Sequence, residues 1–291
     1  MARIDRRSAA NAPGDVFVDD SCIACDTCRR LAPATFGGGE DDVAFVSRQP
    51  APGEERRRAM MALVACPVAA IGSSSKEGAA EAARAFPVEA APGVLDCGYA
   101  AESSFGAASW LVLRPGGNVL VDSPRFAAPL AARIRALGGA RLMFLTHRDD
   151  VADHARWAEA LGCARVLHAR DVSGRTRGVE RIVEGDAPVP LADGVAALPV
   201  PGHTAGSMAL HVGDEYLFTG DHLWGDAEGR LGASRAVCWW DWDAQTASME
   251  KLGALRFRWV FPGHGRPWRA ATHDEARREV LALARAMRGR A

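Results

Sequence analysis

The feature that most constrains the fold of this chain is a set of histidines and aspartates spread over four short segments. The segments read THRDDVADH, PGHTAGS, LFTGD and FPGHG, all in the second half of the sequence. Each lies at the end of an apolar run that predicts a strand, or in a glycine-flanked turn. The set is His147, Asp149, Asp153, His154, His203, Asp221 and His264. Because ligand sites gather at the ends of strands, we expect these residues to form one metal site.

Imidazole and carboxylate groups without a thiolate are ligands that suit zinc, iron or manganese. Asp221 follows a glycine at a strand end, where a carboxylate can bridge two ions. Two neighbouring ions can lower the pKa of a bound water to about 7 and hold the attacking and leaving oxygens. The alternative is that each histidine is a polar core residue and each aspartate a helix cap, as Asp153 could be. The full set favours metal-assisted hydrolysis.

A second pattern lies upstream, where three of the seven cysteines are evenly spaced. Cys22, Cys25 and Cys28 form a C-x-x-C-x-x-C run, and Cys66 precedes a proline. Thiolates at this spacing can wrap one face of a cubane cluster, which a remote fourth cysteine closes. A zinc site with four cysteine ligands is the alternative, but such sites more often pair two C-x-x-C motifs. We therefore expect these four cysteines to bind a 4Fe–4S cluster.

Composition narrows the classes of partner. The net charge is −1 over 291 residues, so nothing indicates binding to nucleic acid or to a membrane surface. No apolar run approaches the length that spans a membrane, and the charged N-terminus does not look like a secretory signal. We expect a cytoplasmic protein that acts on a small molecule, with a redox partner for its cluster.

Four parts are expected along the chain. Residues 1–14 predict a disordered tail, 15–72 a small domain, 73–92 a linker rich in Ser, Ala, Gly and Glu, and 93–291 a large domain. Strands are expected at 16–18, 42–47, 110–113, 118–122, 141–146, 165–168, 195–199, 208–212, 215–219 and 259–261, and helices at 53–65, 129–137, 154–161, 246–255 and 274–287. Strand hairpins followed by βα units predict an α/β (α+β) fold with sheets covered by helices.

Both parts resemble known families. Residues 15–72, with VFVDDSCIACDTC, LAPATF and ACPVAAIG, resemble a single-cluster bacterial ferredoxin, and Cys25 is the ligand that the resemblance ties to a 4Fe–4S cluster. Residues 93–270 resemble the metallo-β-lactamase superfamily, an αββα sandwich with metals at one edge of its two sheets. PGHTAGS, TGD and PGHG match the third, bridging and last ligand segments of that superfamily.

The resemblance implies a role for each matching residue. His203 would bind the first metal, Asp221 would bridge, and Asp153, His154 and His264 would hold the second. We expect Asp221, His203 and His154 to be the catalytic residues among these ligands.

The first segment departs from the pattern of the superfamily, H-x-H-x-D-H. Here two residues are inserted after His147, and an aspartate stands where the second histidine is expected. Asp149 is one replacement ligand, since in an extended strand it points the same way as His147, and Asp150 is its rival. A carboxylate at this position favours iron over zinc. The site could hold one ion or two.

Two functions follow from these features. The first is hydrolysis of a small ester, thioester or lactone-type substrate by a metal-bound hydroxide, with one or two Zn or Fe ions and an attached iron–sulfur domain. The alternative is an oxidoreductase that passes electrons from the 4Fe–4S cluster to an iron site in the large domain. The lack of a flavin motif weakens the alternative, and the near-complete ligand set argues against a simple electron carrier.

Overall fold

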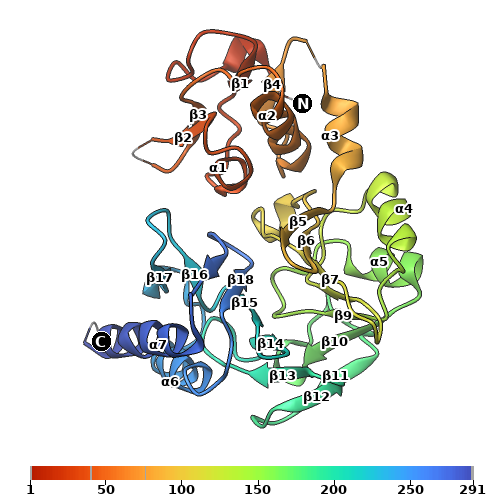
Figure 1. The fold of residues 1–291 in the computed structure, drawn as a ribbon, viewed down its shortest axis with the longest axis vertical. Helices are drawn as coiled ribbons and strands as arrows, with labels where there is room; N and C mark the ends of the chain where they lie inside the picture. Colours follow the sequence, from red (N-terminus) through yellow and green to blue (C-terminus); the bar gives the residue numbers. More distant parts are fainter. Residues whose placement is uncertain (1, 40, 76, 290–291) are drawn as a thin grey trace. The chain divides into compact units, whose positions relative to one another are not determined.

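The computed structural model describes residues 2–39, 41–75 and 77–289, and the chain divides into two units that interleave along the sequence (Figure 1). The first unit comprises Met1–Leu113, Pro124–Gly139 and Ala152–Leu161. The second unit comprises Arg114–Ser123, Ala140–Val151 and Gly162–Ala291. The chain therefore crosses between the units several times, and each unit is described by itself below.

The helices and strands are short and numerous. The α-helices are α1 (Thr27–Leu31), α2 (Glu54–Ala65), α3 (Ala79–Ala85), α4 (Ala128–Ala136), α5 (His154–Leu161), α6 (Trp242–Leu252) and α7 (His273–Arg288), and the 3-10 helices are η1 (Ile4–Arg6), η2 (Glu102–Ser104), η3 (Ala169–Asp171) and η4 (Arg235–Val237). The first unit holds strands β1 (Val16–Val18), β2 (Phe36–Gly38), β3 (Ala44–Val46), β4 (Ile71–Ser73), β5 (Val88–Ala91), β6 (Val94–Asp96) and β7 (Trp110–Val112). The second unit holds β8 (Val119–Val121), β9 (Leu142–Phe144), β10 (Ala164–His168), β11 (Arg181–Val183), β12 (Val189–Ala192), β13 (Val195–Pro199), β14 (Met208–Val212), β15 (Tyr216–Gly220), β16 (Trp224–Gly225), β17 (Leu231–Gly232), β18 (Trp259–Pro262) and β19 (Trp268–Arg269). Every strand and helix expected from the sequence is present, with bounds that shift by a few residues.

The first unit begins with two separate pairs of antiparallel strands. Strand β1 pairs antiparallel with β4, and β2 pairs antiparallel with β3. Helix α2 carries Glu54 and Glu55 in its first turn, where their negative charges interact favourably with the positive end of the helix dipole. The same helix buries Met60 and Met61. The loop between β1 and α1 holds Cys22 and Cys25, Cys28 is the second residue of α1, and Cys66 directly follows α2.

Two segments of the first unit are more structured than the sequence predicts. The segment expected to be a disordered tail contains η1, and the Asn11 side chain accepts a hydrogen bond from the Val18 N–H at 3.1 Å and donates to the Val18 carbonyl at 2.8 Å. The segment expected to be a linker contains helix α3 and strand β5. Its Ala, Glu and Arg residues are strong helix formers, so a composition poor in large apolar residues did not prevent a helix.

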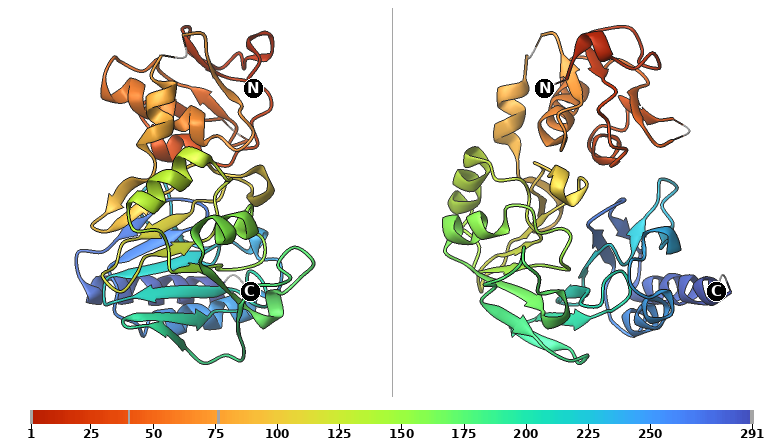
Figure 2. Two further views of the ribbon diagram at one scale, coloured as in Figure 1. Left: turned by 90° about the vertical axis from the view of Figure 1, so that its right-hand side faces the viewer. Right: turned by 180° about the vertical axis from the view of Figure 1, so that it is seen from behind.

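The described residues of the second unit form strands of two larger sheets, and β16 and β17 form a separate antiparallel pair. Strands β8, β9, β10 and β11 pair in parallel in that order. The other sheet has the order β12-β13-β14-β15-β18-β19, and Figure 2 shows its strands side by side. The predicted hairpin of β14 and β15 is confirmed, and β15 also pairs in parallel with β18. Parallel strands end at the same edge, so the segments after β8 and β9 emerge together.

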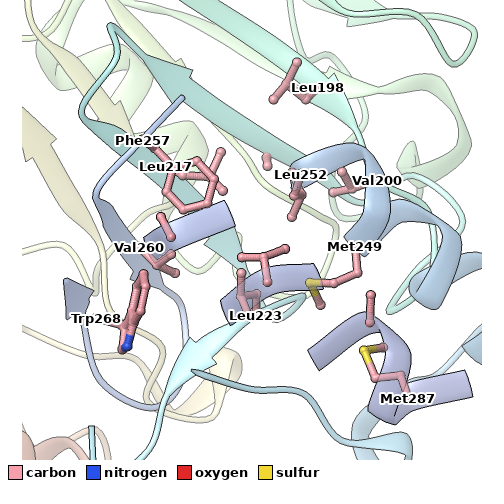
Figure 3. Packing of buried hydrophobic residues seen from close by; sticks show 14 of the residues in the cluster. Leu198, Val200, Leu217, Leu223, Met249, Leu252, Phe257, Val260, Trp268 and Met287 are labelled. Carbon is pink, nitrogen blue, oxygen red and sulfur yellow. The ribbon is translucent and has the colours of Figure 1, made fainter. Parts of the chain in front are cut away.

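One face of the six-stranded sheet packs against α6 and α7. Leu198 and Leu217 of the sheet, Met249 and Leu252 of α6, and Met287 of α7 belong to one buried cluster (Figure 3). Burial of this apolar face fixes the helices on the sheet and leaves the strand ends for the polar segments. No helix within the described residues is long and apolar enough to cross a membrane.

Candidate functional site

Strand β9 carries His147 to the edge of its sheet, where two neighbouring residues, Asp122 and Thr146, set the orientation of the ring. Asp122, just after β8, accepts hydrogen bonds from the Thr146 N–H at 2.8 Å and from the Thr146 hydroxyl at 3.0 Å. The same hydroxyl lies 3.0 Å from His147 Nδ1. Because the hydroxyl proton is donated to Asp122, the hydroxyl accepts from Nδ1–H, and the Nε2 lone pair of His147 faces outward.

His203 is oriented in the same way by a different partner. Its Nδ1 lies 2.7 Å from the Val237 carbonyl, which can only accept, so Nδ1 carries the proton and Nε2 offers its lone pair. Both rings are almost fully buried. Within the described residues, neither His147 Nε2 nor His203 Nε2 has a hydrogen-bond partner. Buried ring nitrogens of this kind are what a metal ion requires.

Two groups of potential ligands, together called the His–Asp groups, surround these nitrogens. His147, Asp149 and His203 form the first group, with Asp149 Oδ2 lying 4.0 Å from His147 Nε2 and 3.6 Å from His203 Nε2. His147, Asp150 and Asp221 form the second. Asp221 Oδ2 lies 3.8 Å from His147 Nε2 and 3.7 Å from His203 Nε2. The carboxylate of Asp221 thus borders both groups.

His264 extends the second group. Its Nε2 lies 3.6 Å from Asp221 Oδ2 and 3.9 Å from Asp150 Oδ1. The preceding residue, Gly263, has no room for a side chain, because an added Cβ would lie 2.6 Å from Asp150 Oδ2 and 2.7 Å from Asp221 Oδ1. The glycine of the PGHG segment therefore allows the backbone to approach the two carboxylates closely.

The charges of this cluster call for a cation. Burial and the charge of Asp221 raise the pKa of Asp150 well above its usual range. Burial also opposes ionisation of Asp221, but His264, His147 and His203 outweigh it and lower the pKa of that carboxyl. Asp150 Oδ2 and Asp221 Oδ1 have no hydrogen-bond partner in the described part of the chain. The donor set fits one or two metal ions that neutralise the carboxylates and accept the free lone pairs.

Asp153 and His154 belong to the first unit. Asp153 Oδ2 accepts a hydrogen bond from the Phe126 N–H at 2.7 Å, so this carboxylate holds the segment before α4. His154 is buried at the first position of α5. The structure thus adds Asp150 to the groups of the second unit, and it gives Asp153 a backbone partner that the superfamily pattern does not predict.

Asp171 is a further residue of the site that sequence reasoning missed. It is completely buried after strand β10, and its Oδ2 accepts hydrogen bonds from the Arg148 N–H at 3.0 Å and the Thr204 hydroxyl at 2.6 Å. Its Oδ1 accepts from the Gly206 N–H at 3.0 Å. Asp171 therefore ties the loop after His147 to the turn that carries His203. The only signal in the sequence is an aspartate that follows a buried strand.

The four cysteines of the first unit line one small cavity, together with apolar residues such as Val18 and Ile71. Two backbone N–H groups point at sulfur atoms, Ala44 N–H at 3.4 Å from Cys22 Sγ and Ala70 N–H at 3.2 Å from Cys66 Sγ. Such donors stabilise thiolate ligands.

The segment that carries Cys22, Cys25 and Cys28, the cysteine loop, has an unusual backbone. Burial also keeps the thiols of the site neutral unless a metal binds. Ala24 and Asp26, between the cysteines, adopt left-handed conformations with φ of 59° and 62°. Burial raises the pKa of the Cys25, Cys28 and Cys66 thiols. A metal or cluster that binds the sulfurs would offset this cost, so the cavity fits an iron–sulfur cluster.

A segment before β7 supports the cysteine loop from the other side. The Thr27 hydroxyl donates to the Gly106 carbonyl at 3.0 Å. Gly106 has φ of +84°, and an added Cβ there would lie 2.6 Å from Cys25 Cβ and 2.8 Å from its Sγ. Arg30, next to the loop, pairs with the buried Asp96. The loop is therefore packed against residues that lie far along the chain.

Comparison with known families agrees with the N-terminal site. The model of the 4Fe-4S single cluster domain of Ferredoxin I matches residues 18–73.

The chain is also similar to curated hydrolases and to solved structures. It is 33% identical over 144 residues to the hydroxyacylglutathione hydrolase of Fuscovulum blasticum, a match that covers 48% of this chain and 54% of that protein. The match to the enzyme of the same name from Stenotrophomonas maltophilia is 34% identical over 152 residues and covers 50% and 55%. The chain spans about half the length of these curated relatives.

The DIM-1 metallo-β-lactamase shares the fold, with a TM-score of 0.52 at 15% sequence identity over 68% of this chain and 95% of that one. At this identity the likeness concerns the fold alone. The mixed α/β architecture agrees with this likeness. The chain has the metallo-β-lactamase fold, and its residues 18–73 match the model of a 4Fe-4S single cluster ferredoxin domain.

Proposed function

We propose that this protein is a metal-dependent hydrolase of a small thioester or ester. The observation that carries the proposal is the cluster of unpartnered donors around Asp221, which comprises the buried Nε2 atoms of His147 and His203 and a free oxygen of Asp150. Ions held there would polarise a substrate carbonyl and activate water. The curated relatives are named for hydroxyacylglutathione, whose acyl group is held in a thioester, and this supports the choice of substrate class.

The proposed ligand sets follow the two groups. His147, Asp149 and His203 would hold the first ion, and Asp150, Asp221 and His264 the second, with Asp221 shared between them. The chain supplies the orientation of these ligands. Thr146 holds His147 and the Val237 carbonyl holds His203, so that each ring keeps its proton on Nδ1 and its lone pair on Nε2.

We further propose that Cys22, Cys25, Cys28 and Cys66 hold a 4Fe–4S cluster. Their common cavity, the N–H donors at two sulfurs and the family match at residues 18–73 support this assignment. The residues between the cysteines bend the loop so that its sulfurs face one space. A redox partner for this cluster remains part of the proposal.

A second function is favoured by one specific observation. Two histidines and one carboxylate, His147, His203 and Asp149, make up the first group. This combination, with positions left open for substrate, is typical of sites that bind non-haem Fe(II). The alternative proposal is therefore an oxidoreductase in which electrons from the cluster reach an iron ion held by this group.

The test is anaerobic metal analysis of the purified protein, together with turnover of a panel of small thioesters and esters. We expect about four cluster irons and one or two further ions, and His203→Ala to lose the non-cluster metal and at least ~100-fold in hydrolysis. His273→Ala is the matched control, since that ring contacts the Asp214 carbonyl and the Arg256 side chain and belongs to neither group of potential ligands. Full hydrolytic activity in His203→Ala would overturn the site.

The two functions can be distinguished by whether turnover depends on the oxidation state of the cluster. A hydrolase that holds zinc at the His–Asp groups should turn over thioesters at the same rate with the cluster reduced or oxidised. The oxidoreductase function would be correct if the His–Asp groups hold iron, if turnover depends on the reduced cluster, and if no thioester is cleaved.

A further inference from the structure

Two adjacent tryptophans lie on the surface of the second unit beside the His–Asp groups. Trp239 is 64% exposed and Trp240 is 51% exposed, and Val237 before them is also exposed. Large apolar side chains grouped on a surface commonly mark a place where something binds. Clustered tryptophans are more commonly packed in a core, whereas these two indoles are exposed.

The backbone of this segment is firmly held, so the exposure does not result from a loose loop. The Trp239 N–H donates to the His203 carbonyl at 3.1 Å, and the Asp241 N–H donates to the Gly202 carbonyl at 3.0 Å. The Asp241 side chain in turn caps helix α6 by accepting from the Ala244 N–H at 2.8 Å. The segment is thus fixed at both ends while its two indoles point away from the core.

The position of Trp239 connects this surface to the metal groups. Its ring centroid lies 6.1 Å from that of His203 in an edge-on arrangement, and the His203 ring lies 4.7 Å from that of His147. The Val237 carbonyl, two residues earlier, is the hydrogen-bond partner that orients His203. The segment that orients His203 therefore also places the Trp239 indole beside the first group of potential ligands.

We propose that Trp239 and Trp240 form an apolar shelf that binds the acyl group of the substrate and selects aromatic or long aliphatic acyl chains. The proposal rests on the proposed hydrolase function, because it needs the carbonyl to lie at the metal groups. Aromatic side chains with few polar groups nearby are the usual lining for the apolar part of a small ligand. A charged or very short acyl group would gain little from two indoles.

The test compares thioesters of one thiol that differ only in the acyl group, acetyl against phenylacetyl, with the metal-loaded full-length protein. Trp239→Ala should raise KM for the phenylacetyl thioester about tenfold, leave its kcat within about twofold, and leave the acetyl thioester unaffected. Trp239→Phe should restore most of the loss, and Trp240→Ala should act in the same direction more weakly. Ile182→Ala, another exposed apolar residue of the second unit, is the control and should change nothing.

A second readout does not depend on turnover. Phenylacetate, the product acid, should bind the metal-loaded wild type in calorimetry and bind about tenfold more weakly to Trp239→Ala, while the metal content of the variant stays unchanged. Equal effects on both acyl groups, a loss of metal, or a change in oligomeric state on Trp239→Ala would each overturn the shelf. If wild-type protein cleaves no thioester at all, the hydrolase proposal fails, and phenylacetate binding alone then decides whether the shelf exists.

Discussion

The four cysteines of the first unit and the histidines and aspartates of the second unit are assembled in different ways. Three cysteines lie in one short segment that runs from a loop into α1, so their relative positions follow from a spacing of three residues and from the bends at Ala24 and Asp26. The second set comes from four segments that meet because parallel strands end at one edge. The first site depends on local backbone geometry, whereas the second depends on tertiary structure and on residues that orient ligands.

The largest effect should come from a change that acts only on the cysteine site. In Gly106→Ala the new methyl group meets Cys25, and the residue has a positive φ that alanine adopts at a cost. We expect iron and sulfide after anaerobic reconstitution to fall to less than half of the wild-type value. Metal bound to the His–Asp groups should stay unchanged in the same samples.

Gly116→Ala is the matched control for that variant. No atom of the described structure lies within 4 Å of a Cβ built at Gly116. This control should keep its full cluster content. A Gly106→Ala protein with normal iron and sulfide would show that the segment before β7 does not constrain the cysteine loop.

An intermediate effect is expected from Asp171→Asn, which acts on the other site. The new NH₂ group would face at least one N–H or hydroxyl donor that now gives a hydrogen bond to the carboxylate. The loops that carry His147 and His203 would therefore lose part of their shared support. Loss of such support typically weakens metal binding ~10–100-fold. Competition with a chelator measures this, and the cluster should remain intact.

The exposed Asp186→Asn is the control for charge and residue type, since Asp186 pairs with Arg170 on the surface. It should leave metal affinity at the wild-type value. Unchanged affinity in Asp171→Asn would mean that the His–Asp groups are organised without this buried carboxylate.

The smallest effect should come from Glu180→Gln, which touches neither site. Hydrogen bonds from Arg165 lower the pKa of Glu180 from its ordinary value of 4.5 to about 2. A lowered carboxyl pKa adds stability above the ordinary value, and that stability is lost as the pH falls from about 4.5 towards about 2. Because Glu180 is nearly half exposed, the variant should lose less than ~1 kcal/mol at pH 7.

Urea unfolding at pH 7 and at lower pH measures this difference. The gap between wild type and Glu180→Gln should narrow as the pH drops below 4.5. A gap that widens on acidification would show that the ion pair with Arg165 does not set the ionisation of Glu180.

The same contrast explains what could be predicted from the sequence. Cys22, Cys25, Cys28 and Cys66 stand in a spacing that defines the site directly, and the structure places all four around one cavity. Strand ends and glycine turns identified His203, Asp221 and His264, because those features are local. Most helices and strands followed from apolar periodicity for the same reason.

The parts that could not be predicted depend on the path of the loop after β9. Two inserted residues leave open whether Asp149 or Asp150 replaces the missing histidine ligand, whereas the resemblance to the superfamily assigns Asp153 to the second metal. In the structure Asp149 and Asp150 join different groups, and Asp153 bonds the Phe126 N–H. The support from Asp171 is likewise invisible in sequence, because it forms only when distant loops meet.

We propose that Asp150, in place of the Asp153 of the superfamily pattern, is the carboxylate from the first segment in the second group of metal ligands. The most direct measurement is the non-cluster metal content of Asp150→Asn and Asp153→Asn, determined by elemental analysis beside wild type. We predict that Asp150→Asn loses about one ion per chain while Asp153→Asn, which can still accept from Phe126, keeps the wild-type content. Full metal content in Asp150→Asn, with loss of an ion in Asp153→Asn, would contradict the account.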